Sequence, residues 1–385
     1  NHFNFFPLSL GKFIASAKIQ EIHFSLTKGF WRNNIWGYAV RDAPSGAELS
    51  VLFQRLQDNP SKAWREVTST LSGHFCASLN FIDKAATVQP VYSFRPEGVT
   101  FNGSVDNNLL FYAALPHEAV CTENLTPWKK MLPCFDKAGL SSLLNAKHLF
   151  NSHYFSLALD FKPICETQSC KRTQMQLTQS VSVVFNPTVV FDGKKSWSLI
   201  KLFGTPLKQS CDLASESSVL VDITRNDSSN PHAFTSQPTD EITETFGDEK
   251  RKFAVFDVKK LLSENKDKQD NKLNIVSLYK KPHTYWVTVT PPVHASRYIT
   301  GYGVSEGGIS CHIYNKLSQN VSIIYMDVIP WYLRIYIHTL KITVSRDLQT
   351  TGRSKKVEPD AFYYKPALDR TQPHHIEIGL TLLPN

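Results

Sequence analysis

Short strand-like segments recur along most of this 385-residue chain, and they constrain the fold more than any other feature. Beyond residue 150 helical periodicity nearly disappears, and strand-like stretches follow one another at 154–161, 175–185, 196–203 and 218–223. Regular spacing of such stretches is typical of antiparallel sandwiches. Pro outnumbers Gly, 21 to 17, which suits strands joined by structured turns. We therefore expect a mainly β protein with a few helices.

The length and the local patterns predict two domains. Residues 1–150 are expected to form a mixed α/β domain, and residues 151–385 an antiparallel β-sandwich-like domain. The stretch 226–245 is rich in Ser, Thr and Pro, which predicts a mobile polar loop.

Four helices are predicted. Three lie at 13–17, between 140 and 149, and, as a single turn, at 258–263. The fourth begins at Pro60, after Asn59 as its N-cap, and ends at Gly73. The other predicted strands lie at 19–26, 48–54, 75–82, 91–94, 109–114, 253–256, 275–279, 285–289, 298–302, 321–328, 332–344 and 376–383.

Composition excludes two broad classes. No run of about 18 apolar residues is present, so this sequence contains no membrane-spanning helix. The net charge is +8, but Lys and Arg are spread along the chain, as on an ordinary solvated surface. We therefore expect no nucleic-acid partner.

Cysteines and glycosylation acceptors indicate a secretory compartment. Asn124-Leu125-Thr126 lies between Cys121 and Cys134, and three more Asn-x-Ser/Thr acceptors begin at Asn102, Asn226 and Asn320. Thiols in that oxidising compartment usually form disulfides. The chain has seven cysteines, so at least one is free or paired with another chain.

No motif for catalysis, cofactor binding or metal binding stands out. Cys121 precedes the acidic Glu123 and has no assured basic partner, and Gly-x-Ser-x-Gly, phosphate-loop and His-Glu-x-x-His patterns are missing from the sequence. Cys76, among apolar neighbours, is interpreted as a small buried side chain. The adjacent His374 and His375 would point to opposite faces of a strand. We expect no catalytic residue, no metal and no cofactor.

Several long segments of the sequence resemble the PIG-T subunit family of the glycosylphosphatidylinositol (GPI) transamidase. The segments that carry the resemblance are Gly29-Phe30-Trp31-Arg32, Ala43-Pro44-Ser45-Gly46-Ala47-Glu48-Leu49, Phe75-Cys76-Ala77-Ser78-Leu79-Asn80-Phe81-Ile82-Asp83, Val120-Cys121-Thr122-Glu123-Asn124-Leu125-Thr126-Pro127-Trp128, Leu213-Ala214-Ser215-Glu216-Ser217 and Pro330-Trp331-Tyr332-Leu333-Arg334. They occur in the same order from near Phe6 to Pro384.

The resemblance implies a non-catalytic subunit of an endoplasmic reticulum membrane complex that attaches GPI anchors to precursor proteins. In that family the nucleophile belongs to a caspase-like partner subunit, which is joined to PIG-T by an interchain disulfide. The matching cysteine here is Cys121. Family members also carry an N-terminal signal and a C-terminal membrane helix, so this chain is expected to be the lumenal portion.

Other interpretations remain open at this point. Cys121 could pair within the chain with Cys134, since twelve intervening residues close a comfortable loop. A secreted carbohydrate- or lipid-binding sandwich could use Trp31, Trp36 and Trp128 as stacking platforms. A free cysteine hydrolase is the third alternative.

Overall fold

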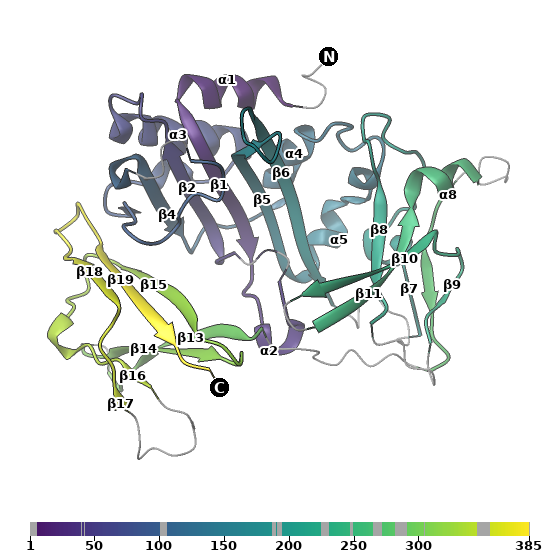
Figure 1. Cartoon of the computed structure of the whole chain (residues 1–385). Helices are drawn as coiled ribbons and strands as arrows, with labels where there is room; N and C mark the ends of the chain where they lie inside the picture. Colours follow the sequence, from purple (N-terminus) through teal and green to yellow (C-terminus); the bar gives the residue numbers. More distant parts are fainter. Residues whose placement is uncertain are drawn as a thin grey trace.

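The computed structural model describes residues 6–39, 41, 43–100, 106–186, 190, 195–224, 231–246, 249–264, 272–281, 291–303, 305–344 and 355–384. The described elements form an N-terminal region (6–186), a middle region (195–281) and a C-terminal region (291–384), which Figure 1 shows grouped around one large sheet. Among the described residues, strands outnumber helices and every strand pairing is antiparallel. The prediction of a mainly β fold with a few helices is confirmed.

The N-terminal region is built on a six-stranded sheet with the order β3-β4-β2-β1-β5-β6. Its strands are β1 (Ile19–Lys28), β2 (Gly46–Phe53), β3 (Thr87–Val88), β4 (Leu110–Leu115), β5 (Ser152–Cys165) and β6 (Thr173–Phe185). β5 pairs directly with the central strand β1. A domain boundary after residue 150 would cut β5 and β6 away from the sheet to which they belong, so the two predicted domains do not match the pairing.

Helices cover one face of this sheet. They are α1 (Leu8–Ser16), α3 (Pro60–Phe75), α4 (Thr122–Lys130) and α5 (Ala146–Phe150), with the short α2 (Asn33–Trp36) in a loop. Asn59 caps α3 as predicted, because its side chain accepts a hydrogen bond from Lys62 N. Apolar side chains of α1, α3, α4 and α5 share one core with the sheet. This core is the largest in the molecule as described.

The two faces of β1 differ in chemistry. Ile22, Phe24 and Leu26 belong to the apolar core, whereas the alternate positions carry polar side chains from Glu21 to Thr27. Alternate strand residues point to opposite faces, so one face of the sheet is apolar and the other polar. On that polar face, Thr27 and Ser156 of β5 share a buried hydrogen bond of 2.7 Å.

The middle region has two small sheets, ordered β10-β11-β8 and β7-β12-β9, with its own core. Its elements are β7 (Ser196–Ser198), α7 (Leu199–Phe203), β8 (Ser218–Asp222), β9 (Ala233–Phe234), β10 (Asp240–Phe246), β11 (Glu249–Asp257), α8 (Val258–Glu264) and β12 (Val276–Leu278). A disulfide between Cys134 and Cys211 ties this region to the segment that follows α4.

The C-terminal region contains the sheets β13-β14, β15-β19-β18 and β16-β17. Its strands are β13 (Val293–Thr300), β14 (Gly308–Asn315), β15 (Val321–Ile329), β16 (Thr343–Val344), β17 (Lys355–Lys356), β18 (Ala361–Lys365) and β19 (His374–Leu382). Only three apolar residues form its buried cluster, namely Ile329, Ile376 and Ile378, among the described positions. Contacts with the N-terminal region must therefore help to position it.

Five local predictions differ from the structure. Residues 75–82 are not a strand: α3 continues to Phe75, whose ring packs 4.8 Å from that of Phe24, and Cys76 then ends the helix with a positive φ of 53°. The left-handed residue is thus Cys76 rather than Gly73, which lies inside the helix. Residues 91–94 form a loop, 199–203 form a helix, and 332–344 contain only a 3-10 turn and the two-residue strand β16.

Two further predictions need correction in extent. The single helix expected between 140 and 149 is split into a 3-10 turn, Leu140–Leu143, and the helix α5. The polar stretch 226–245 includes β9 and most of β10, because alternating residues such as Ile242 let β10 pair with β11. The strand predicted at 285–289 lies outside the described residues.

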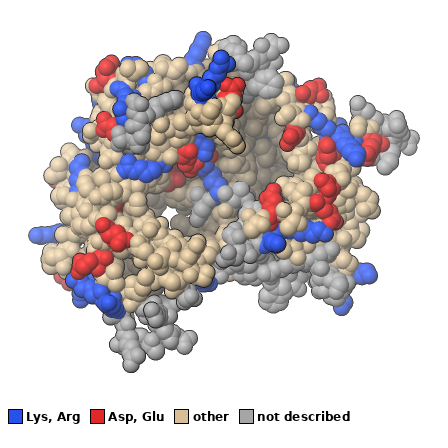
Figure 2. Space-filling view, in the orientation of Figure 1, with Lys and Arg blue, Asp and Glu red and all other residues tan. Residues whose placement is uncertain are grey.

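Within the described ranges, no helix combines the length and apolar character that crossing a bilayer requires. On the face seen in Figure 2, Lys and Arg alternate with Asp and Glu without forming a large patch of one sign.

Candidate functional site

Cys121 is exposed and unpaired at the start of α4. The helix begins there because Asn124, three residues along, turns its side chain back and accepts a hydrogen bond from Cys121 N at 2.7 Å. A side-chain cap of this kind satisfies a backbone amide that the start of a helix otherwise leaves without a hydrogen-bond partner. The sulfur therefore stands on a rigid element at the protein surface, accessible to a second thiol.

The other cysteines narrow the choice of partner for Cys121. Cys134 is bonded to Cys211, which overturns the alternative of a Cys121–Cys134 bond. Cys165 and Cys170 close the hairpin between β5 and β6. Three thiols stay free: Cys121 and Cys76, which are exposed, and Cys311, which is partly buried. The interpretation of Cys76 as a buried side chain was wrong, because the helix end turns it outward.

The acceptor Asn124 does not fit a glycan in this conformation. Its side chain is fully buried, and its amide Nδ2 donates to the carbonyl oxygens of Phe75 and Cys76 at 2.8 and 3.1 Å. A glycan attaches at this nitrogen and replaces one of its two hydrogens, so at least one of these bonds would be lost and the α3–α4 packing around the buried side chain would have to open. Asn320 is exposed and remains a predicted glycosylation site, whereas Asn102 and Asn226 lie outside the described residues.

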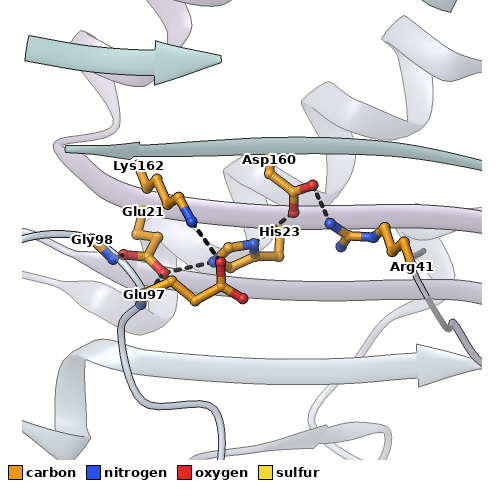
Figure 3. Close-up of polar contacts among 7 residues, drawn as sticks. All are labelled: Glu21, His23, Arg41, Glu97, Gly98, Asp160 and Lys162. Atoms are coloured by element: carbon orange, nitrogen blue, oxygen red, sulfur yellow. Dashed lines mark hydrogen bonds and ion pairs between the residues drawn. The ribbon is translucent and has the colours of Figure 1, made fainter. Parts of the chain in front are cut away.

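A charged cluster on the polar face of the sheet was not found from the sequence. His23 of β1 lies between two carboxylates: its Nε2 is 2.6 Å from Glu21 Oε1, and its Nδ1 is 2.7 Å from Asp160 Oδ1 (Figure 3). Asp160 also pairs with Arg41. The cluster joins β1 and β5 because His23 and Asp160 are directly opposite in the ladder.

Glu21 also holds a loop. Its two carboxylate oxygens accept hydrogen bonds from the backbone N–H groups of Glu97 and Gly98, at 2.9 and 3.0 Å (Figure 3). The side chain of Glu97 reaches Lys162 of β5 at 2.7 Å. The loop is thereby fixed across the end of β1.

The titration of the cluster favours a structural role. Burial alone would lower the pKa of His23, but hydrogen bonds to Asp160 and Glu21 outweigh it and raise the pKa to about 9. Burial raises the pKa of each carboxyl, yet the bonds from His23, with the loop amides for Glu21 and Arg41 for Asp160, bring both below their ordinary values. At neutral pH His23 is an imidazolium with both nitrogens occupied, so it cannot act as a general base for the neighbouring Ser25.

The remaining sequence candidates have structural contacts. Trp128 is buried and donates to Ala158 O at 3.1 Å, so it offers no stacking platform. Trp31 and Trp36 contact each other and Tyr154 as edge-to-face or tilted rings. Both ring nitrogens of His374 are engaged, by Tyr364 and Ala367 on one side and Leu333 O on the other. In the part of the chain that is described, no group of three or more potential ligands could hold a metal ion.

A signal for the missed residues does exist in the sequence. Glu21-Ile22-His23 in β1 and His375-Ile376-Glu377 in β19 place an acid and a base two positions apart, and hence on one face of a strand. Buried charges are costly unless paired, so such a pattern indicates an internal ion pair. His375 Nε2 indeed lies 2.9 Å from Glu377 Oε1.

Comparison with known proteins identifies the family. The family model described as Gpi16 subunit, GPI transamidase component, matches residues 1–194 and 189–385. The chain is 42% identical to the mouse GPI-anchor transamidase component PIGT and 41% identical to the human one, over 390 residues and its entire length. It is 29% identical to the Saccharomyces cerevisiae GPI transamidase component GPI16.

The matched part is not the whole of these relatives. The chain spans 64% of the mouse protein, 65% of the human protein and 67% of the yeast protein. The match nevertheless runs through every region described above, from α1 to β19. The chain therefore belongs to the Gpi16 family of GPI transamidase components.

Proposed function

We propose that this chain is a non-catalytic lumenal scaffold of a GPI transamidase, joined through Cys121 to the caspase-like catalytic subunit. In this role it holds the catalytic subunit in place while GPI anchors are attached to precursor proteins. The precursor and the GPI lipid are contacted through the assembled complex, together with its other membrane subunits. The compartment is the endoplasmic reticulum, on the lumenal side of the membrane.

The observation that carries the proposal is the state of Cys121. Two intrachain disulfides use four of the seven cysteines, and Cys121 is left exposed at a rigid helix start. A thiol in an oxidising compartment is a ready partner for a second thiol. Among the hydrogen bonds of the described residues, none joins Cys121 Sγ to a histidine, which supports a linking rather than a nucleophilic role.

Nonreducing electrophoresis of the purified complex tests the link. We expect one band that contains both subunits, its conversion to two bands on reduction, and its loss in Cys121→Ser. Cys76→Ser is the matched control, because Cys76 is also free and exposed. A linked band that persists in Cys121→Ser, or disappears in Cys76→Ser, contradicts the assignment.

A further inference from the structure

β6 ends the six-stranded sheet and pairs with β5 alone. The ladder runs along its whole length, from Thr173 opposite Cys165 to Phe185 opposite Ser152. Among the described residues, no strand lies on its other side. In an antiparallel ladder only every second N–H of such a strand points to its neighbour, so the others face outward. β6 thus offers a row of unused backbone donors and acceptors.

The composition of β6 leaves this edge unprotected. Its thirteen residues, TQMQLTQSVSVVF, include no charged residue, no Pro and no Gly. Proteins normally guard an edge with charges, proline or a very short strand. The opposite edge of the same sheet follows that rule, since β3 has two residues. The edge strand β10 does so as well, with Asp240, Glu241 and Glu244.

The faces of β6 specify what could pair with it. Leu177, Val181 and Val183 pack against the apolar core. Thr178 lies opposite Asp160 in the ladder and therefore continues the polar face of the sheet. An added strand would match both faces if apolar residues alternated with small polar ones. In the view of Figure 2 the surface is hollowed where, in Figure 1, the edge of β6 looks toward β8.

Helix α4 connects this edge to Cys121. The side chain of Gln179 in β6 donates to Trp128 O in α4 at 3.0 Å. Cys121 lies seven residues earlier, at the other end of the same helix, or about 10 Å along its axis. A protein bound at the sulfur is thus within reach of the sheet edge.

We propose that β6 receives an extended strand from the subunit joined at Cys121, so that the six-stranded sheet continues into the partner. The added segment is uncharged over its paired length and alternates apolar with small polar residues. Strand addition supplies affinity through main-chain hydrogen bonds and selectivity through alternate side chains. This inference rests on the proposed function for the identity of the partner, but the open edge does not depend on the disulfide.

Residue-resolved hydrogen–deuterium exchange on the full-length subunit, alone and within the complex, tests the proposal. In the subunit alone, amides between 174 and 184 should alternate between slow and fast exchange. In the complex both sets should be slow, as is also expected for β5, which has a neighbour on each side. Alternation that persists in the complex overturns the proposal. Uniformly slow exchange in the subunit alone, whether as a monomer or as a dimer, also overturns it.

Charges placed on the edge provide a second test. Gln176 and Thr178 are exposed, so Gln176→Lys combined with Thr178→Lys should leave the fold intact while guarding the edge. We expect about tenfold lower recovery of the catalytic subunit, which corresponds to about 1.4 kcal/mol. Ser322→Lys, on the exposed edge strand β15, is the control and should change nothing. Full recovery with the β6 variant contradicts the proposal.

The two proposals fail in distinguishable ways. If no reducible band depends on Cys121 while both sets of β6 amides are slow in the complex, the disulfide assignment fails and strand addition stands. If the band is present while alternate β6 amides stay fast, the scaffold role stands and strand addition fails.

Discussion

Two buried carboxylates hold opposite ends of one loop, residues 91–98, and they do so from different regions of the molecule. Glu21, in the N-terminal sheet, accepts from the amides of Glu97 and Gly98. Glu377, in the C-terminal sheet, accepts from the amides of Val91, Tyr92 and Ser93 at 2.6 to 2.8 Å, and from the Ser93 hydroxyl at 2.9 Å. Each acid also contacts a histidine two residues away in its own strand.

The difference between them lies in what each one joins. Glu21 ties the loop to its own sheet, where His23 has Asp160 as a second partner. Glu377 is fully buried and ties a separate region to that loop, using three successive amides that form an anion-binding concavity. Burial raises the pKa of Glu377, but the bonds from His375 and these amides lower it to about 2. Buried acids that accept from backbone amides therefore serve two purposes: Glu21 fixes the loop to its own sheet, and Glu377 fixes the position of the C-terminal region.

The largest effect is expected from Glu377→Gln. An amide cannot accept with both of its ends, so buried N–H groups that Glu377 now satisfies lose their acceptor, and each buried donor left unpaired costs roughly 1–3 kcal/mol. Because the C-terminal region has a small core, it should detach before the rest unfolds. Limited proteolysis should show early cleavage between the middle and C-terminal regions.

Two variants sharpen this result. Glu358→Gln, on an exposed side chain of the same region, should be silent. Glu21→Gln should lower the free energy of unfolding of the N-terminal region by roughly 2–3 kcal/mol without early cleavage before β13. Identical cleavage patterns for Glu21→Gln and Glu377→Gln would remove the distinction between the two anchors.

Gly98→Ala tests how tightly the loop is seated. A Cβ there would lie 2.7 Å from Pro163 Cδ, 2.8 Å from Pro163 O and 2.9 Å from Glu21 Oε2. We expect a loss of about 1–3 kcal/mol in thermal or denaturant unfolding. Gly73→Ala is the control: in the last turn of α3 a Cβ at this position meets nothing within 4 Å, so stability should rise by about 0.5–1 kcal/mol. A neutral Gly98→Ala would mean that the loop can shift away from β5.

A pH dependence also separates the two anchors. The pKa of His23 is raised from 6.5 to about 9, so its contribution is complete below pH 6.5 and is lost as the pH rises through 9. The pKa of Glu377 is lowered from 4.5 to about 2, so its contribution is lost only as the pH falls from 4.5 toward 2. Between pH 6.5 and 9 the melting temperature should fall in the wild type and fall less in His23→Gln. Equal slopes would contradict the pairing of His23 with both acids.

Local rules predicted much of the N-terminal region. The Asn59 cap, the apolar face of α3 and the alternation of β1 are encoded within a few residues, and all three are found. Failures occurred where a distant contact decided the outcome. Phe75 extends α3 because its ring meets Phe24, fifty-one residues earlier, and residues 91–93 form a loop that Glu377 anchors. No local pattern reports such partners.

The candidate site shows the same division. The glycosylation acceptor beside Cys121 favours a surface position, and Cys121 is exposed. The cap made by Asn124, which buries the acceptor side chain itself, could not be predicted from the neighbouring residues. The acid–base pairs in β1 and β19 can be recognised in the sequence, but the sequence does not show that one loop lies between them in the fold. That both acids bind the same loop follows from how the chain folds and not from the residues next to them.

The disulfide between Cys134 and Cys211 has a practical consequence for anyone who dissects the complex chemically. Dithiothreitol added to release the partner proposed at Cys121 would also break the disulfide that joins the middle region to the segment after α4. Inactivation by such a reagent would then conflate detachment of an enzyme with loosening of its support. Only a genetic replacement of Cys121, with the other disulfides left oxidised, separates loss of the partner from loosening of the middle region.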